Sequence, residues 1–195
     1  MKIIANIIII VGLALVFYSG YNIYDNHAKQ NESIAQANEL ITKTNSNSEG
    51  GKPTSAEDMD INQGDVIGIL YIPRFDKELP IVSGTDEEEL DRGVGHYTTT
   101  VLPGQGDQIL LSGHRDTVFR GFGDLEMGDE FIVKMPYGEF TYVMYEDEIV
   151  DADDRTVIRS TAPDEILTLS TCYPFGFVGS APDRYIVYAK PVDAE

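Results

Sequence analysis

The sequence predicts an all-β domain, a closed barrel or a sandwich, that follows one N-terminal membrane helix. Two observations support this prediction. The chain begins with an almost uninterrupted apolar run, from Ile3 to Tyr18. From Asp65 onward, short runs rich in β-branched and aromatic residues alternate with Gly, Pro and Asp, with no internal repeat and no sustained helical periodicity. Strands that recur at such intervals are typical of barrels and sandwiches.

The apolar run predicts a membrane anchor over residues 1–24. It reaches about twenty residues, the length that a spanning helix needs, when the chain as far as Ile23 is counted. Aromatic residues that suit the membrane interface flank its end, at Tyr18, Tyr21 and Tyr24. A cleaved signal peptide is the alternative, but no small-x-small cleavage site directly follows the run. Lys2 on the short flank predicts a single-pass protein of the cell membrane, with its N-terminus inside and its main domain extracellular.

Residues 25–60 are predicted to form a flexible extracellular stalk. They are rich in Asn, Ser, Gln, Thr and Glu and contain few large apolar residues, so they cannot build a core. A short helix over 33–40, next to the membrane, is the one regular element expected there.

The remaining residues, 61–195, are enough for one domain with its own hydrophobic core. The single cysteine excludes an intramolecular disulfide framework and a multi-cysteine metal site. The formal net charge of −19, from 33 acidic and 14 basic residues, argues against a nucleic-acid partner, because phosphate binding requires clustered Lys and Arg.

Within this domain the chain shows seven β-type runs, a hairpin turn and a short helix. The turn is predicted at Tyr137-Gly138, and a capping-box pattern at Thr85–Glu88 predicts a helix that ends near Gly93. The predicted strands are Val66–Ile72, Leu79–Val82, Gln108–Ser112, Glu130–Met135, Glu139–Val150, Glu165–Thr171 and Tyr185–Ala189.

The candidate nucleophile is Cys172, because an unpaired thiol in an exported protein is usually there to react. Such a thiol requires a base or a positive neighbour, and acyl transfer requires a donor for the oxyanion. His114 follows a predicted strand and is the best candidate base. His27 lies in the predicted stalk, where a fixed geometry with Cys172 is implausible. His96 lies in a Gly-rich loop, where it either lies near the site or serves only in packing.

Three segments together resemble the sortase signature: Ser112–Asp116, Thr168–Cys172 and Arg184 at the head of the last predicted strand. Their order and spacing match as well as their residue types, and the resemblance extends over about residues 66–190. It implies an eight-stranded sortase-type β-barrel with short helices. In that fold the cysteine ends the seventh strand and the arginine begins the eighth.

The resemblance also implies the reaction, a transpeptidation without a cofactor. An LPxTx-type sorting signal is cleaved after Thr through a thioacyl intermediate, and the surface protein that carries it is joined to a peptidoglycan precursor amine. The implied catalytic residues are Cys172 as nucleophile, His114 as acid and base, and Arg184 as donor to substrate and oxyanion. Thr171 and, with weaker support, His96 are expected to contact substrate. Asp116 either orients His114 or is an ordinary turn residue.

Among sortases the chain looks most like class D. There is no hydrophobic segment after Lys190, no Asp-Pro-aromatic lid motif before Leu102 and no room for a helical insertion over 173–183. The housekeeping class is the alternative. The segments 93–97 and 102–104 look more like class D.

Six carboxylates lie within nine positions at the end of a long predicted strand, in 146–154. Related enzymes bind calcium near this strand, but the spacing here is not that of an EF-hand, and a solvated acidic face explains it. No metal site is therefore expected. Two other functions stay open: a membrane-tethered cysteine peptidase that transfers acyl groups to water, and a non-catalytic barrel that binds peptides.

Overall fold

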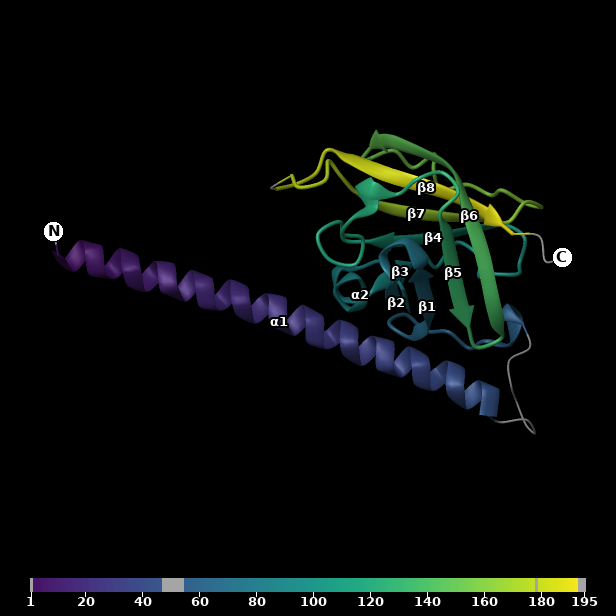
Figure 1. The fold of residues 1–195 in the computed structure, drawn as a ribbon, viewed down its shortest axis with the longest axis horizontal. Helices are drawn as coiled ribbons and strands as arrows, with labels where there is room; N and C mark the ends of the chain where they lie inside the picture. The colour runs from purple at the N-terminus through teal and green to yellow at the C-terminus, as the bar shows by residue number, and fades with distance from the viewer. Residues whose placement is uncertain (1, 47–54, 178, 193–195) are drawn as a thin grey trace.

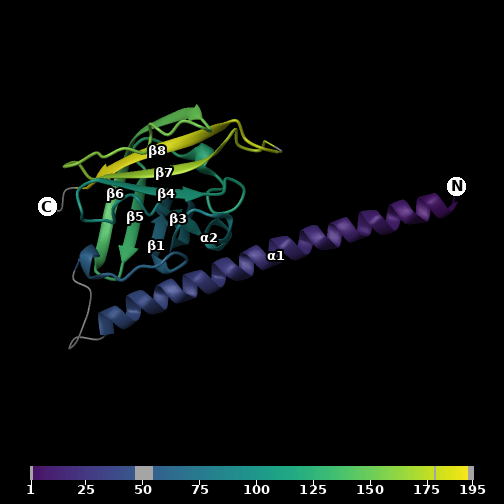
Figure 2. The same ribbon diagram turned by 180° about the vertical axis from the view of Figure 1, so that it is seen from behind.

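The computed structural model describes residues 2–46, 55–177 and 179–192. It consists of a closed eight-stranded β-barrel and one long helix, α1 (Lys2–Ser46), which runs past the side of the barrel (Figure 1). The view from behind shows the N-terminal half of α1 extending away from the barrel (Figure 2). The all-β barrel that follows an N-terminal helix is therefore confirmed.

Around the barrel the strand order is β1-β2-β3-β4-β7-β8-β6-β5, and β5 closes onto β1. The pairs β2–β3 and β4–β7 are parallel, and the other pairs are antiparallel. The strand bounds are β1 Val66–Ile72, β2 Lys77–Ser83, β3 Val94–His96, β4 Gln108–Gly113, β5 Glu130–Met135, β6 Gly138–Asp151, β7 Ile166–Tyr173 and β8 Asp183–Pro191.

The structure differs from the sequence prediction at three small elements. Strand β3 was not predicted, because three residues are too few to show an alternation. Helix α2 (Glu87–Arg92) has Asp86 at its N-cap position, one residue after the predicted position, and this side chain makes no capping hydrogen bond. The β5–β6 turn is formed by residues 136–137, because Gly138 already pairs with Met135.

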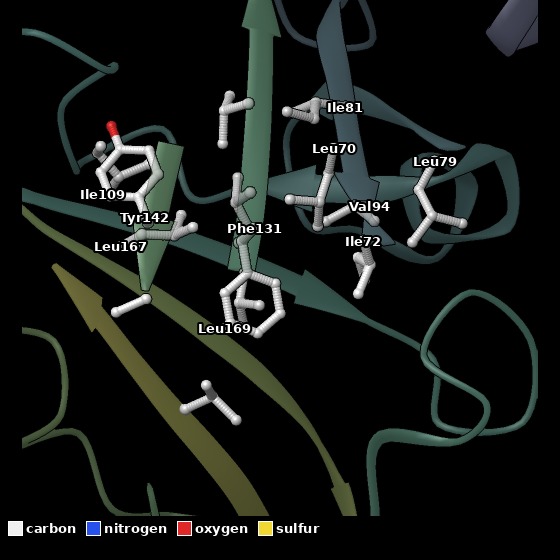
Figure 3. Packing of buried hydrophobic residues seen from close by; sticks show 14 of the residues in the cluster. Leu70, Ile72, Leu79, Ile81, Val94, Ile109, Phe131, Tyr142, Leu167 and Leu169 are labelled. Atoms are coloured by element: carbon white, nitrogen blue, oxygen red, sulfur yellow. The ribbon is translucent and has the colours of Figure 1, made fainter. Parts of the chain in front are cut away.

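The barrel interior is filled by alternate side chains of the strands, as the period-2 pattern requires. Figure 3 shows aliphatic side chains from several strands packed around two rings, those of Phe131 and Tyr142. The hydroxyl of Tyr142 donates a hydrogen bond to the Glu165 carboxylate at 2.7 Å. Burial raises the pKa of Tyr142 well above its usual value, so this hydroxyl stays protonated as the donor. The buried hydroxyl of Tyr142 therefore has a hydrogen-bond partner.

The sequence predicts a flexible stalk over 25–60 with a short helix over 33–40, whereas over 25–46 the structure continues α1; residues 47–54 of the predicted stalk lie outside the described residues. The helix is fixed here by packing against the barrel. Ser33 and Ala37, one turn apart, are 1% and 0% exposed. Lys29 of α1 lies 3.6 Å from the carboxylate of Asp91 of α2. Small side chains let the helix approach closely, and this contact leaves no apolar stripe in the sequence.

Candidate active site

Cys172 and Arg184 lie directly opposite each other on neighbouring strands. The last residues of β7 pair with the first residues of β8, and Cys172 is in register with Arg184. Side chains of directly opposed residues project from the same face, with Cβ atoms roughly 5 Å apart. Both side chains are partly exposed. The register therefore places a cation beside the thiol.

His114 reaches the same place from the other side of β7. Strand β4 runs parallel to β7 with Gly113 in register with Thr171, so His114 follows beside Cys172. The Thr171 hydroxyl donates a hydrogen bond to the Gly113 carbonyl at 2.7 Å, and Thr171 is 3% exposed. Thr171 thus fixes the strand that carries the thiol to the strand that carries the imidazole.

Gly113 is required by the tight turn after β4. A Cβ on this residue would lie 2.7 Å from a methyl of Val118 and 2.8 Å from the ring of Phe119. Both neighbours are buried, so neither side chain can move aside. The absence of a side chain at position 113 allows the 114–119 turn to fold back over the barrel end.

Cys172, His114 and Arg184 line one cavity of about 280 Å³, the active-site cavity. Strand residues also line it, including Leu110 of β4 and Ile186 of β8. The guanidinium of Arg184 donates to the backbone carbonyl of its neighbour, Asp183, at 3.0 Å. Within the described part of the chain no carboxylate lies within 4.0 Å of this guanidinium, so its other N–H groups are left for a ligand in the cavity.

The chain also matches known proteins in sequence. The model of the sortase domain matches residues 70–192. The chain is 42% identical to Sortase D of Bacillus subtilis (strain 168), and the alignment covers 98% of each protein. It is 26% identical to Sortase A of Bacillus anthracis over 95% of this chain and 91% of that protein.

The chain belongs to the sortase family.

Solved structures agree with this sortase's fold. A Sortase D5 transpeptidase of Clostridium perfringens superposes with a TM-score of 0.68 at 24% identity, over 81% of this chain and 99% of that one. A sortase from Actinomyces oris superposes with a TM-score of 0.62 at 30% identity, over 69% and 83% of the two chains. The cysteine transpeptidase activity expected from the sequence is that of the family, and the observed barrel is the family's fold.

Arg115 is a feature of this sortase that the sequence analysis missed. It follows His114 and is 9% exposed, and its guanidinium donates to three backbone carbonyls of the β7–β8 loop. The acceptors are Pro174 at 3.0 Å, Phe177 at 2.5 Å and Gly179 at 3.3 Å. Arg115 therefore ties the turn after the histidine to the loop after the cysteine. No spacing in the sequence could reveal it, because the acceptors are main-chain atoms about sixty positions away.

The other candidate residues lie elsewhere or have other partners. His96 is 5% exposed, and its Nε2 lies 3.1 Å from the Val101 carbonyl. It does not line the active-site cavity, and burial lowers the pKa of its ring. His27 lies on α1. The Asp116 carboxylate accepts from Arg115 at 3.3 Å and is largely exposed, which is the environment of a turn residue.

The carboxylates of the acidic segment 146–154 accept hydrogen bonds from several different donors. Glu148 accepts from the hydroxyl of Tyr188 at 2.6 Å, and Asp151 and Asp154 each accept from a backbone N–H two residues on. Across the described residues no three His, Cys, Asp or Glu side chains converge as they would around a metal ion.

Proposed function

We propose that this sortase uses Cys172, His114 and Arg184 to cleave an LPxTx-type sorting signal after its threonine and to pass the acyl group to a peptidoglycan precursor amine. The observation that supports the roles most directly is the register of β7 and β8. It sets the only thiol of the chain opposite Arg184, in a cavity that His114 also lines.

In the first half-reaction the Cys172 sulfur, as thiolate, attacks the threonine carbonyl carbon. The carbonyl oxygen gains negative charge, and Arg184 donates to it, because a guanidinium stays protonated and offers several N–H groups. The C–N bond then breaks, and His114 gives its proton to the departing amine. A thioacyl enzyme and a free amine result.

In the second half-reaction the acceptor amine attacks the same carbon. His114 takes the proton that this amine loses, and the C–S bond breaks to return the thiolate. The new amide replaces the old one, so no oxidant, reductant or cofactor is needed. Thr171 acts on this geometry through its bond to Gly113, which holds the strands of His114 and Cys172 together.

We further propose that residues 1–24 are a retained membrane anchor, with the N-terminus inside and the barrel of the 61–195 domain outside. Within the described residues, α1 holds one stretch long and apolar enough to cross a membrane. Lys2 on its short flank supports this orientation. The extracellular barrel then has access to surface proteins and to the wall amine.

The test uses the full chain in lipid nanodiscs with a small set of LPxTx peptides, with and without diaminopimelate or glycine amines. Mass spectrometry is expected to find a thioacyl adduct on Cys172 and an amide product that depends on the added amine. Cys172→Ala is expected to abolish both, and Cys172→Ser to leave at most a trace, because a hydroxyl is far less ionised than a thiol. Arg184→Lys is expected to lose more than about tenfold, or ~1.4 kcal/mol of transition-state stabilisation.

Three results would contradict the proposal. Cleavage near the wild-type rate in Cys172→Ala excludes this nucleophile. Cleavage that never incorporates an amine identifies a hydrolytic peptidase instead. Peptide binding with neither cleavage nor an adduct identifies a binding barrel.

A further inference from the structure

The barrel is held on one face of α1 with no flexible segment between the contact and the apolar run. The contacting positions include Gln30, Ser33 and Ala37, which recur every three or four residues and so share a face. The helix rises about 1.5 Å per residue. The height of the barrel above the apolar run is therefore set by the helix itself.

The active-site end of the barrel is the end nearer to the apolar run. In both ribbon views the loop that joins β7 and β8 lies on the side toward which the N-terminal half of α1 extends (Figures 1 and 2). This loop connects Cys172 to Arg184. The turn that follows His114 lies at the same end, because Arg115 bonds it to the loop.

A second cavity, of about 910 Å³, lies between α1 and this end of the barrel, and we call it the helix-side cavity. Its walls include Leu15 and Tyr18 of the apolar run, and Lys77, Asp116, Thr117 and Arg120 of the barrel. The α1 wall of this cavity runs from Leu15 to Gln30, so the cavity, which the turn after His114 also lines, spans the end of the proposed 1–24 anchor, where a bilayer would present its headgroups.

Two cations lie beside each other on the barrel wall of this cavity. The Lys77 ammonium donates to the Arg120 carbonyl at 2.7 Å, and the Arg120 guanidinium donates to the Asp116 carbonyl at 3.1 Å. Among the described residues neither cation has a carboxylate within 4.0 Å. Burial and, less strongly, the charge of Arg120 lower the pKa of Lys77. An anion placed between the two cations would relieve their repulsion.

We propose that Lys77 and Arg120 bind the phosphate groups of anionic phospholipids in the outer leaflet, and so hold the active-site end of the barrel on the bilayer surface. This inference rests on the proposed membrane anchoring of residues 1–24. The chain as a whole carries a formal charge of −19, which an anionic surface repels, so attraction to such a surface requires local cations such as these two. Each basic side chain near an anionic bilayer favours the bound state by about fivefold.

The test measures the depth of the turn after His114 relative to the bilayer surface. A spin label is attached through Thr117→Cys in the full chain that also carries Cys172→Ala, which removes the only native thiol. The chain is placed in nanodiscs of phosphatidylcholine alone or with phosphatidylglycerol. Relaxation by oxygen, which partitions into lipid, is compared with relaxation by a water-soluble nickel chelate. A label at headgroup depth in the phosphatidylglycerol discs is expected.

Charge reversal gives the decisive comparison. Lys77→Glu with Arg120→Glu is expected to move the label into water, with at least a tenfold fall in the ratio of oxygen to nickel relaxation. The matched control, Arg159→Glu with Lys190→Glu, makes the same change in net charge at exposed sites outside both cavities and is expected to leave the depth unchanged. Equal effects of the two double variants, or none from the first, would overturn the proposal.

Two further arms separate the remaining outcomes. If a spin label attached through Leu15→Cys lies in water, the anchor is not inserted and both proposals fail. If the Leu15 label lies in the bilayer and the Thr117 label lies in water, only the proposed headgroup contact is overturned. Release of the Thr117 label from the surface by millimolar glycerol phosphate would assign the two cations to a soluble phosphate instead of the bilayer.

Discussion

Replacing Arg115 with Gln is expected to slow transpeptidation without unfolding the barrel. The substitution removes three charge-assisted hydrogen bonds to the β7–β8 loop. Each such bond is worth about 1.5–3 kcal/mol. Phe177 and Gly179 are exposed and their carbonyls regain water, so the net loss is closer to 2–4 kcal/mol in all. At about 1.4 kcal/mol per factor of ten, the loop then leaves its ordered position at least ten times more often.

The assay follows amine-dependent product formation by the full chain in phosphatidylcholine nanodiscs. The rate constant kcat is expected to fall at least tenfold, because the displaced loop no longer holds Cys172 and His114 together, whereas the melting temperature moves little. The pH profile of Cys172 alkylation is expected to change, since His114, which lines the same cavity as Cys172, is less well placed. Arg115→Lys, which keeps the charge and can reach one of the carbonyls, is expected to recover part of the rate.

The matched control is Arg159→Gln, which removes the same charge from an exposed side chain outside the active-site cavity. It is expected to behave as the wild type. A value of kcat for Arg115→Gln within twofold of the wild type, with an unchanged alkylation profile, would refute the reasoning. A fall in kcat that is fully explained by a smaller fraction of folded protein would also refute it.

Three other predictions follow from the same geometry. In the peptide-cleavage assay, His114→Ala is expected to lose at least about 100-fold as a missing acid and base, and His96→Ala much less; the opposite ranking would move the site to β3. Burial lowers the pKa of His96, so the stability that its neutral ring contributes is complete above the unfolded value of about 6.5 and is lost as the pH falls through the lower folded pKa. Thermal melts of the wild type and His96→Gln are therefore expected to diverge less at pH 5 than at pH 8, and a constant difference would contradict this. Transpeptidation is expected to persist in excess chelator, and its complete loss with recovery in micromolar calcium would show that the carboxylates of 146–154 bind an essential ion.

The sequence predicted most of the barrel, because its strands are short runs rich in β-branched and aromatic residues that are separated by Gly, Pro and Asp. Val66–Ile72 and Glu130–Met135 have the predicted bounds. Of the helix over 25–46 only the part over 33–40 was predicted, since Ser33 and Ala37 pack by being small and leave no hydrophobic pattern that would extend it.

The candidate site was found in the sequence through residue types and their resemblance to a family signature. The register of β7 against β8 could not be predicted in this way, because the eleven or so residues between Cys172 and Arg184 do not determine which strand positions face each other. Arg115 was missed for a related reason. Its acceptors are main-chain carbonyls, which every residue has, so no residue type in the sequence marks the partners of Arg115.

The pairing of β7 with β8 also sets when in its biosynthesis this enzyme acquires its chemistry. The thiol, the imidazole and the guanidinium come from three strand ends, and the guanidinium belongs to the last strand of the barrel. During synthesis Cys172 is added to the chain before Arg184. Until β8 inserts between β6 and β7, the barrel is open and the thiol has no cationic neighbour opposite it. The fold thus delays assembly of the complete site until the last strand of the barrel has paired with both of its neighbours.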